Sequence, residues 1–334
     1  MDHTAERVTL ARLPSGVEIE TTVHTYDGDR DGPTVYAQAA QHGREINGTE
    51  VLRRVHGRLT GGPEADVAGR DDPDLELAGR LIAVPVADPL TFDRVSYTTP
   101  EQLDSVNPNM NRVWPGDPEG SLHERMAARL WEYVADADAV LDLHTGSPEM
   151  LTHVVFTEGH ERSRRLAEAF GTDLLLSEAA GEDADEEWAS RDFGGKLRVA
   201  AAREDVPTIT PELAHNKQFV EDAVETGVTG VLDALAHLGL LDRDPEPSGE
   251  RVVARNHLGR VTAEESGLFR ADPDRSVGER VAAGERVGTL YHPTSYEVIQ
   301  EVETDRAGVL YALTREATVT SGGKLANVAL VRED

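Results

Sequence analysis

The 334-residue sequence contains no cysteine, only three lysines and no long apolar run. Without cysteine the chain cannot form disulfides, iron–sulfur clusters or thiol nucleophiles, so any metal must be held by histidine, carboxylate or backbone oxygen. No run approaches the roughly 18 apolar residues that span a bilayer. The first ten residues also lack the basic flank and apolar centre of a signal peptide. These absences predict a cytoplasmic protein.

Negative charge dominates the composition. The 62 aspartates and glutamates face only 33 lysines and arginines, which gives a net charge of -29. Such a surface repels nucleic acid and anionic membranes, so neither is expected as a partner. The acidic residues are interleaved with regular apolar periods, which favours a folded, halophilic protein adapted to concentrated salt over a disordered chain. A chain of this size and charge could also form a homodimer.

Short apolar segments alternate with amphipathic ones between about residues 33 and 240. This alternation predicts an α/β fold whose mostly parallel sheet carries helices on both faces. Ser121 and Glu124 form a capping box at the start of one helix. The predicted strands are 34–40, 81–87, 139–143, 153–157 and 207–213, and the predicted helices are 122–135, 161–170, one within 217–239 and one from about Asn47.

Prolines and charges interrupt this pattern at 242–250 and predict a linker. We therefore expect a large α/β domain over residues 1–243 and a small all-β domain over 250–334. The second region holds two V-x-x-G patterns, at 281–287 and 319–325, which predict two similar strand–turn–strand units.

Two motifs supply candidate metal ligands. His42 and Glu45 lie in QHGREING, directly after the strand 34–40, and His144 ends another strand in LDLHTGSP. The carboxyl ends of parallel strands line the ligand crevice of an α/β sheet. Two histidines and one glutamate suit catalytic zinc with one position left for water, although each motif alone is weak. Asp142 could orient a ligand or be a buried polar residue of the core.

Two further positions could act on a substrate. Asn111 and Arg112 lie in a turn-rich loop, and a guanidinium matches the geometry of a carboxylate, although an isolated arginine is more often a surface residue. Glu212 ends the strand 207–213, where a carboxylate can move a proton between water and a leaving amine. The remaining histidines that we considered lack a partner at ligand spacing, and we expect surface or packing positions for them: His24, His56, His123, His153, His160, His215, His237, His257 and His292.

The ordered set H-x-x-E, N-R-x-x-P-G, D-L-H-T-G and P-E-L resembles the succinylglutamate desuccinylase/aspartoacylase family, which is related to zinc carboxypeptidases. The resemblance covers about residues 33–240. It implies a zinc-carboxypeptidase-like catalytic domain that hydrolyses the amide bond of a small N-acyl amino acid or related N-acylated amine. It also implies one Zn²⁺ per chain bound by His42, Glu45 and His144, with Glu212 as the general base and Asn111 and Arg112 gripping the substrate carboxylate.

The C-terminal region resembles the barrel-sandwich, lipoyl-like domain of some deacylases in this family. Arg306 occupies the place of the attachment lysine, so no lipoyl group is expected. Relatives often carry another arginine near the position of Tyr97, whereas the nearest arginine here is Arg94, which leaves the donor to the oxyanion open. The tail tyrosines that could reach the site are Tyr291, Tyr296 and Tyr311.

Two alternatives remain. A zinc carboxypeptidase acting on short peptides would use the same ligands and arginine, although a C-terminal domain over the site would obstruct peptides. A non-catalytic metal-binding protein on the same scaffold would need neither Glu212 nor Arg112.

Overall fold

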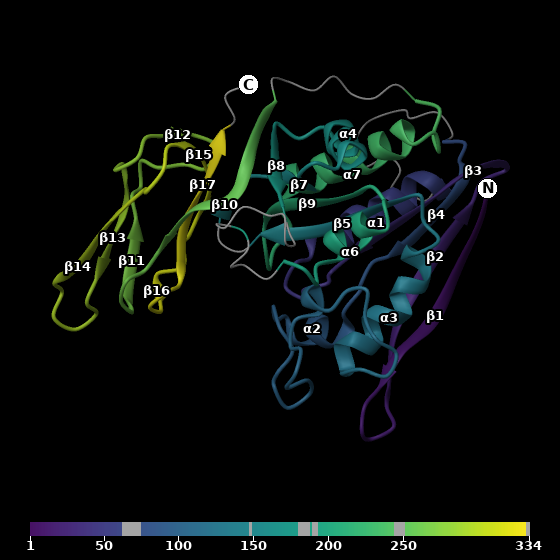
Figure 1. The fold of residues 1–334 in the computed structure, drawn as a ribbon, viewed down its shortest axis with the longest axis horizontal. Helices are drawn as coiled ribbons and strands as arrows, with labels where there is room; N and C mark the ends of the chain where they lie inside the picture. Colours follow the sequence, from purple (N-terminus) through teal and green to yellow (C-terminus); the bar gives the residue numbers. More distant parts are fainter. Residues whose placement is uncertain (62–74, 147–148, 180–187, 189–192, 244–250, 332–334) are drawn as a thin grey trace.

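The computed structural model describes residues 1–61, 75–146, 149–179, 188, 193–243 and 251–331. In this part of the chain a mixed main sheet of 13 strands is accompanied by a separate antiparallel sheet of four (Figure 1). The main sheet has the order β1-β2-β4-β3-β5-β9-β7-β8-β10-β17-β15-β12, with β6 beside β15, and the small sheet has the order β14-β13-β11-β16.

The first strands of the chain are β1 (Asp2–Arg12), β2 (Glu18–Asp27), β3 (Arg30–Ala39), β4 (Ala78–Val84), β5 (Ala139–Gly146), β6 (Glu149–Met150), β7 (His153–Thr157), β8 (Leu174–Glu178) and β9 (Thr208–His215). The C-terminal strands are β10 (Val252–Thr262), β11 (Gly267–Ala271), β12 (Arg280–Val281), β13 (Arg286–Tyr291), β14 (Val298–Glu303), β15 (Gly308–Leu313), β16 (Thr318–Val319) and β17 (Lys324–Val331). The helices are α1 (Asn47–Thr60), α2 (Pro89–Arg94), η1 (Met110–Arg112), α3 (Leu122–Val134), α4 (Glu161–Phe170), α6 (Leu197–Arg203) and α7 (Glu221–His237).

The predicted fold class is confirmed. Strands β4, β3, β5 and β9 pair in parallel, as do β7, β8 and β10, and the antiparallel pair β7–β9 joins the two groups. Every predicted strand corresponds to a strand of this sheet, and α4 spans the predicted residues 161–170. The hairpin β1–β2 and the strand β8 are additions that the sequence pattern did not predict.

Strand alternation divides the core between the two faces of the main sheet. On β5, Leu141 and Leu143 face a cluster that includes residues of α1, α4 and α7, whereas Val140 belongs to the cluster with α3 and α6. The capping box of α3 is present, with Ser121 and Glu124 bonded reciprocally. Helices therefore cover both faces of the sheet, as the apolar strands require.

The C-terminal region contributes to both sheets. Strand β10 pairs in parallel with β8, so the main sheet includes residues from both sides of 244–250, and the division into two domains stays a prediction. Gly284 and Gly322 have φ angles of 81° and 77°, left-handed values that favour glycine, in the turns β12–β13 and β16–β17. The two V-x-x-G patterns thus correspond to two strand–turn–strand units. Arg306 is exposed in the turn between β14 and β15.

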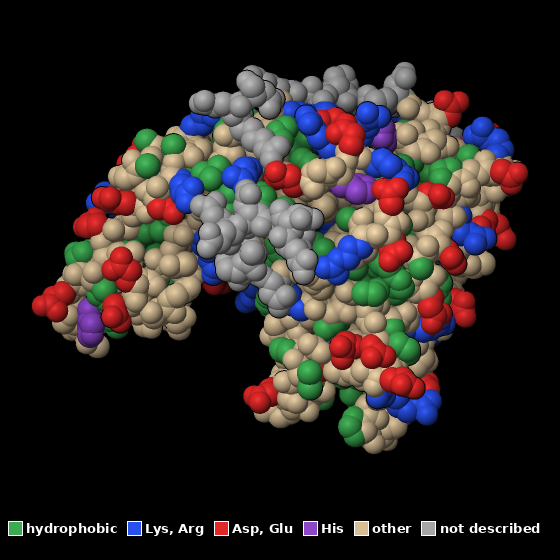
Figure 2. Space-filling view, in the orientation of Figure 1, with side chains coloured by type: hydrophobic (Ala, Val, Ile, Leu, Met, Phe, Trp, Pro, Cys, Tyr) green, Lys and Arg blue, Asp and Glu red, His purple; other side chains and the backbone are tan. Residues whose placement is uncertain are grey.

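Acidic side chains are spread over the visible face of the molecule and interleaved with basic ones (Figure 2). Carboxylates appear on the main body and on the C-terminal strands alike, without a single block of one charge (Figure 2). No helix among the described residues is long and apolar enough to cross a membrane.

Candidate metal centre and its cavity

A cavity of about 730 Å³ lies at the carboxyl ends of β5 and β9. Loops after β3 and before α6 line it together with strands of the main sheet, including β10, β15 and β17 from the C-terminal region. All six residues that the sequence analysis singled out for the site line this cavity: His42, Glu45, Asn111, Arg112, His144 and Glu212.

Strand alternation and register explain why side chains from β5 and β9 meet. Asp142 and His144 are two residues apart on β5 and therefore point to the same face of the sheet, opposite to Leu141 and Leu143. In the parallel pair β5–β9, His144 lies beside Glu212. The same face thus presents a carboxylate, an imidazole and a second carboxylate to the cavity.

His42, Glu45 and His144 form a buried cluster in which one donor atom of each lies within 4.8 Å of the others. Glu45 Oε2 accepts hydrogen bonds from His144 Nδ1 at 2.9 Å and from the backbone N of Thr145 at 3.2 Å. The turn that carries His42 and Glu45 passes so close to α2 that a Cβ on Gly43 would lie 1.9 Å from the backbone of Thr91. Glycine at this position therefore permits the tight turn that brings the first two donors to the third.

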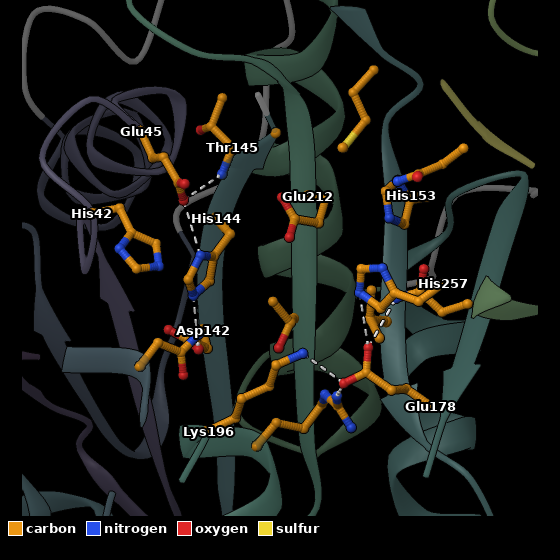
Figure 3. Close-up of a pocket in the computed structure, with 18 of the residues that line it drawn as sticks. His42, Glu45, Asp142, His144, Thr145, His153, Glu178, Lys196, Glu212 and His257 are labelled. Carbon is orange, nitrogen blue, oxygen red and sulfur yellow. Dashed lines mark hydrogen bonds and ion pairs between the residues drawn. The ribbon is translucent and has the colours of Figure 1, made fainter. Parts of the chain in front are cut away.

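Hydrogen bonds fix the orientation of both histidine rings, and Figure 3 shows those of His144. His42 Nδ1 donates to the backbone oxygen of Tyr97 at 2.9 Å, which leaves Nε2 with its lone pair. His144 Nε2 lies 3.1 Å from Asp142 Oδ2, which leaves Nδ1 for the cluster. Asp142 is itself held by Gln38 Nε2 at 2.8 Å. A carboxylate or carbonyl behind each imidazole is the usual support of metal-ligating histidines.

The charges of the cluster favour a cation. Burial disfavours the imidazolium of His144, but the carboxylates of Asp142 and Glu45 outweigh it and raise the pKa of His144 well above its usual value. Burial lowers the pKa of His42 to about 4, so this ring is neutral, the form of imidazole that can bind a metal. Two carboxylates that stabilise a proton on His144 would stabilise a metal ion in its place, and the N₂O donor set suits zinc. The residues present therefore fit the metal that the fold implies.

Glu212 lies next to this cluster, beside His144 in the pair β5–β9. Within the described residues its carboxylate makes no hydrogen bond and no ion pair. Burial raises the pKa of Glu212 to about 7; His144 opposes the shift and Glu45 adds to it. A carboxylate with a pKa near neutrality can both take up and release a proton at physiological pH.

Asn111 and Arg112 reach the cavity from η1. Asn111 Oδ1 accepts a hydrogen bond from the backbone N of Leu197 at 3.2 Å, and Arg112 Nη1 donates to the backbone oxygen of Asn111 at 2.6 Å. A Cβ on Gly195 would lie 1.9 Å from the backbone oxygen of Arg112, so only glycine allows this approach. The close contact places Lys196 in the same cavity as Arg112, and the guanidinium retains donors for an anion.

A second ionic cluster lies across the cavity around Glu178 (Figure 3). Lys196 Nζ is 2.7 Å from Glu178 Oε1, Arg198 pairs with the same oxygen, and His257 Nε2 is 3.3 Å from Oε2. Asn256 Nδ2 donates to Oε2 at 3.0 Å. Burial opposes ionisation, but Lys196 and Arg198 hold the pKa of Glu178 well below its usual value. This cluster has a net positive charge, because the single carboxylate of Glu178 faces both Lys196 and Arg198.

The sequence analysis missed most of this second cluster and the residues that β17 supplies, whereas it named Tyr311 of β15 among the tyrosines that could reach the site. His153 and His257 line the cavity, whereas the sequence analysis predicts surface or packing positions for them. Lys196 and Lys324 line it as well, and they are two of only three lysines in the chain. In a sequence whose cations are almost all arginine, the scarcity of lysine was a signal that could have found them.

The structure reduces the number of candidate donors to the oxyanion. Arg94 is exposed and does not line the cavity, whereas Tyr97 and Arg44 do. The guanidinium carbon of Arg44 lies 4.8 Å from the centre of the Tyr97 ring, and that ring is 4.0 Å from the ring of His42. Of the tail tyrosines, Tyr311 lines the cavity, while Tyr296 is 81% exposed.

A parallel-core α/β sheet with a buried His–Glu–His group at its strand ends is typical of metal-dependent hydrolases. The model of the succinylglutamate desuccinylase/aspartoacylase catalytic domain matches residues 31–238, more than half of the chain. The protein therefore belongs to this family of deacylases and is a hydrolase.

Individual relatives agree with the family match. An N-alpha-acetyl-L-2,4-diaminobutyric acid deacetylase of Halomonas elongata is 27% identical over 317 residues, 91% of this chain and 84% of the relative. The product-bound structure of an ectoine utilization protein from Ruegeria pomeroyi superposes with a TM-score of 0.80 at 20% identity, covering 98% of this chain and 95% of that one. A succinylglutamate desuccinylase/aspartoacylase structure from Rhodobacter sphaeroides gives 0.78 at 24% identity, with coverages of 99% and 96%. At 20% and 24% identity, these two structures show a similarity of fold.

Proposed function

We propose that the protein hydrolyses the amide bond of a small N-acyl amino acid or related N-acylated amine, with one Zn²⁺ bound by His42, Glu45 and His144. The observation that carries this proposal is the position of Glu212. An ionisable carboxylate that has no partner among the described residues lies between an anionic cluster that suits a metal and a cationic cluster that suits a substrate carboxylate. A protein that only bound metal would not need this arrangement.

Each residue has a distinct part in the proposed reaction. A zinc ion held by His42, Glu45 and His144 would supply Lewis acidity toward the amide carbonyl and the attacking water. Glu212 takes a proton from the attacking water as the carbon–oxygen bond forms, and it returns the proton to nitrogen as the carbon–nitrogen bond breaks. The products are a carboxylate and an amine. Asn111 and Arg112 orient the substrate through its carboxylate, and Tyr97 or Arg44 donates to the carbonyl oxygen as it gains charge.

The walls of the cavity favour a small substrate over a peptide. Side chains from β10, β15 and β17 face the metal cluster across the cavity, among them Tyr311 and Lys324. A peptide would have to displace them, which argues against the carboxypeptidase alternative. The relative from Halomonas elongata is named for an acetylated diamino acid, so we include N-acetylated diamino acids among the candidate substrates.

The test is a panel of N-acetyl and N-succinyl amino acids, N-acetylated diamino acids and short peptides. Amine release is measured in molar KCl, since the acidic surface predicts a need for salt, with added zinc and with a chelator. Zinc-dependent release from one N-acyl class supports the proposal and identifies the acyl group. Cleavage of the peptides alone would establish the carboxypeptidase instead. A folded, zinc-loaded protein that hydrolyses none of these compounds would contradict the proposal.

A further inference from the structure

A second group of potential metal ligands lies outside the cavity, on the N-terminal hairpin. Among the described residues, His3, His24 and His56 each offer a ring nitrogen within 4.8 Å of the other two, and none of them lines the cavity. They come from β1, β2 and α1. Three imidazoles from three elements therefore converge on one point.

The hairpin register brings the first two rings together. His3 lies opposite Tyr26 across the antiparallel pair, and His24, two residues earlier, points to the same face of β2. His3 Nε2 is 3.1 Å from His24 Nδ1. Zinc–nitrogen bonds of about 2.0–2.1 Å in tetrahedral geometry place two ligand nitrogens roughly 3.3–3.4 Å apart. Small side-chain rotations are enough to admit a metal between these atoms.

Tyr26 orients the third ring. It is buried in the core beneath α1, and its hydroxyl oxygen lies 2.8 Å from Nδ1 of His56. When the phenol oxygen accepts a hydrogen bond from Nδ1–H of His56, Nε2 of that ring keeps its lone pair and can bind a metal. This is the support that ligating histidines usually receive from a neighbouring polar group.

The ionisation of the rings agrees with this geometry. Burial and the nearby imidazoles lower the pKa of His24, and burial and His3 lower that of His56. Neutral imidazole is the form that binds metals. A donor set of three imidazoles without a carboxylate suits zinc, copper or nickel and does not suit magnesium or calcium.

We propose that His3, His24 and His56 form a second transition-metal site, separate from the hydrolytic centre, which ties the edge hairpin β1–β2 to α1. The three rings are only half-buried, so a fourth position is open to water or to an external ligand. The net charge of -29 raises the local concentration of cations around such a site. The proposal does not depend on the reaction at the hydrolytic centre.

The test counts bound zinc in the full chain without a histidine tag, by equilibrium dialysis against Zn²⁺ followed by elemental analysis. We expect two equivalents for the wild type. The double variant His24→Ala/His56→Ala and the double variant His42→Ala/His144→Ala should each retain one. His237→Ala, a surface histidine on α7, is the control and should retain two.

A single wild-type equivalent that the His24→Ala/His56→Ala protein retains, or two equivalents in that folded variant, would overturn the second site. Circular dichroism establishes that the variant is folded. If alanine unfolds the chain, His56→Gln removes the third ligand while it preserves a hydrogen bond to Tyr26, and the same loss of one equivalent is expected. In the His42→Ala/His144→Ala background, zinc should still raise the melting temperature, because the remaining ion joins β1, β2 and α1.

Discussion

The two sides of the cavity hold similar residues with opposite balances of charge (Figure 3). On the metal side, Asp142 and Glu45 surround two imidazoles, so carboxylates are in excess and a cation is stabilised. On the other side, Glu178 meets both Lys196 and Arg198, so cations are in excess. A substrate with an amide at one end and a carboxylate at the other fits this gradient.

Glu212, between the two clusters, shows what distinguishes them. All of these carboxylates are buried, and burial alone raises the pKa of each. Ionic partners reverse this effect for Asp142, Glu45 and Glu178, whose pKa values are lowered. Glu212 has no such partner within the described residues, so burial prevails. The position of partners, and not the residue type, separates structural carboxylates from the candidate base.

Replacing Glu212 by glutamine is the most direct test of the difference between the candidate base and the structural carboxylates. If Glu212 transfers the proton, Glu212→Gln should lower kcat by about 10²–10⁴-fold, because general acid–base catalysis contributes that much. Zinc content and melting temperature should stay close to those of the wild type, since the carboxylate makes no hydrogen bond or ion pair in the described part of the chain. Steady-state kinetics and metal analysis provide the measurements. Activity of the folded variant within tenfold of the wild type would remove Glu212 from the mechanism.

The corresponding exchange on the cationic side should act on stability instead. Glu178→Gln leaves two buried cations without a counter-charge, and breaking a buried ion pair in this way costs about 3–5 kcal/mol of unfolding free energy. Glu168→Gln is the matched control, because it removes a surface pair with Arg164 on α4 that is worth only about 0.3–0.5 kcal/mol. Denaturant unfolding measures both. Equal losses for the two variants would show that the Glu178 cluster is not a structural unit.

On the metal side, removal of a supporting carboxylate should weaken the metal site. We expect Asp142→Asn to lower zinc affinity by about 10–100-fold, because the carboxylate orients His144 and increases its basicity. Asp104→Asn is the control, since Asp104 lies 3.2 Å from His123 in a buried contact outside the cavity. Competition with a zinc chelator measures the affinities. Identical affinities for both variants and the wild type would contradict the role of Asp142.

The metal side could be predicted from the sequence because its residues follow recognisable strands. QHGREING and LDLHTGSP each end an apolar run, and parallel strands bring such ends together. The prediction for Asp142 stayed open between site and core, because the face of a strand depends on its register. Only the structure places Asp142 and His144 on the cavity face.

The cationic side could not be predicted because its strands carry weaker signals. LLLSE, which forms β8, holds only three apolar residues, too short a run for periodicity to distinguish a strand from part of a helix. Had it been predicted as a strand, Glu178 at its end would have been a candidate like Glu212. His257 and Lys324 come from strands whose place in the main sheet rests on the pairing of β10 with β8. Such long-range pairing has no local signature.

The smallest of the expected effects is a change of kcat/KM with pH, caused by the titration of lysines on the cationic side. Burial lowers the pKa values of Lys196 and Lys324 to about 8, so both lose charge when the pH rises above that value. If their charge attracts the substrate carboxylate, kcat/KM, which reports the free enzyme, should fall by up to about tenfold per pH unit above pH 8. Lys324→Arg keeps its charge in this range and should reduce the fall if Lys324 is responsible. An unchanged alkaline limb in Lys324→Arg would assign the titration to Lys196, and a flat profile for the wild type would show that neither charge contributes to substrate capture.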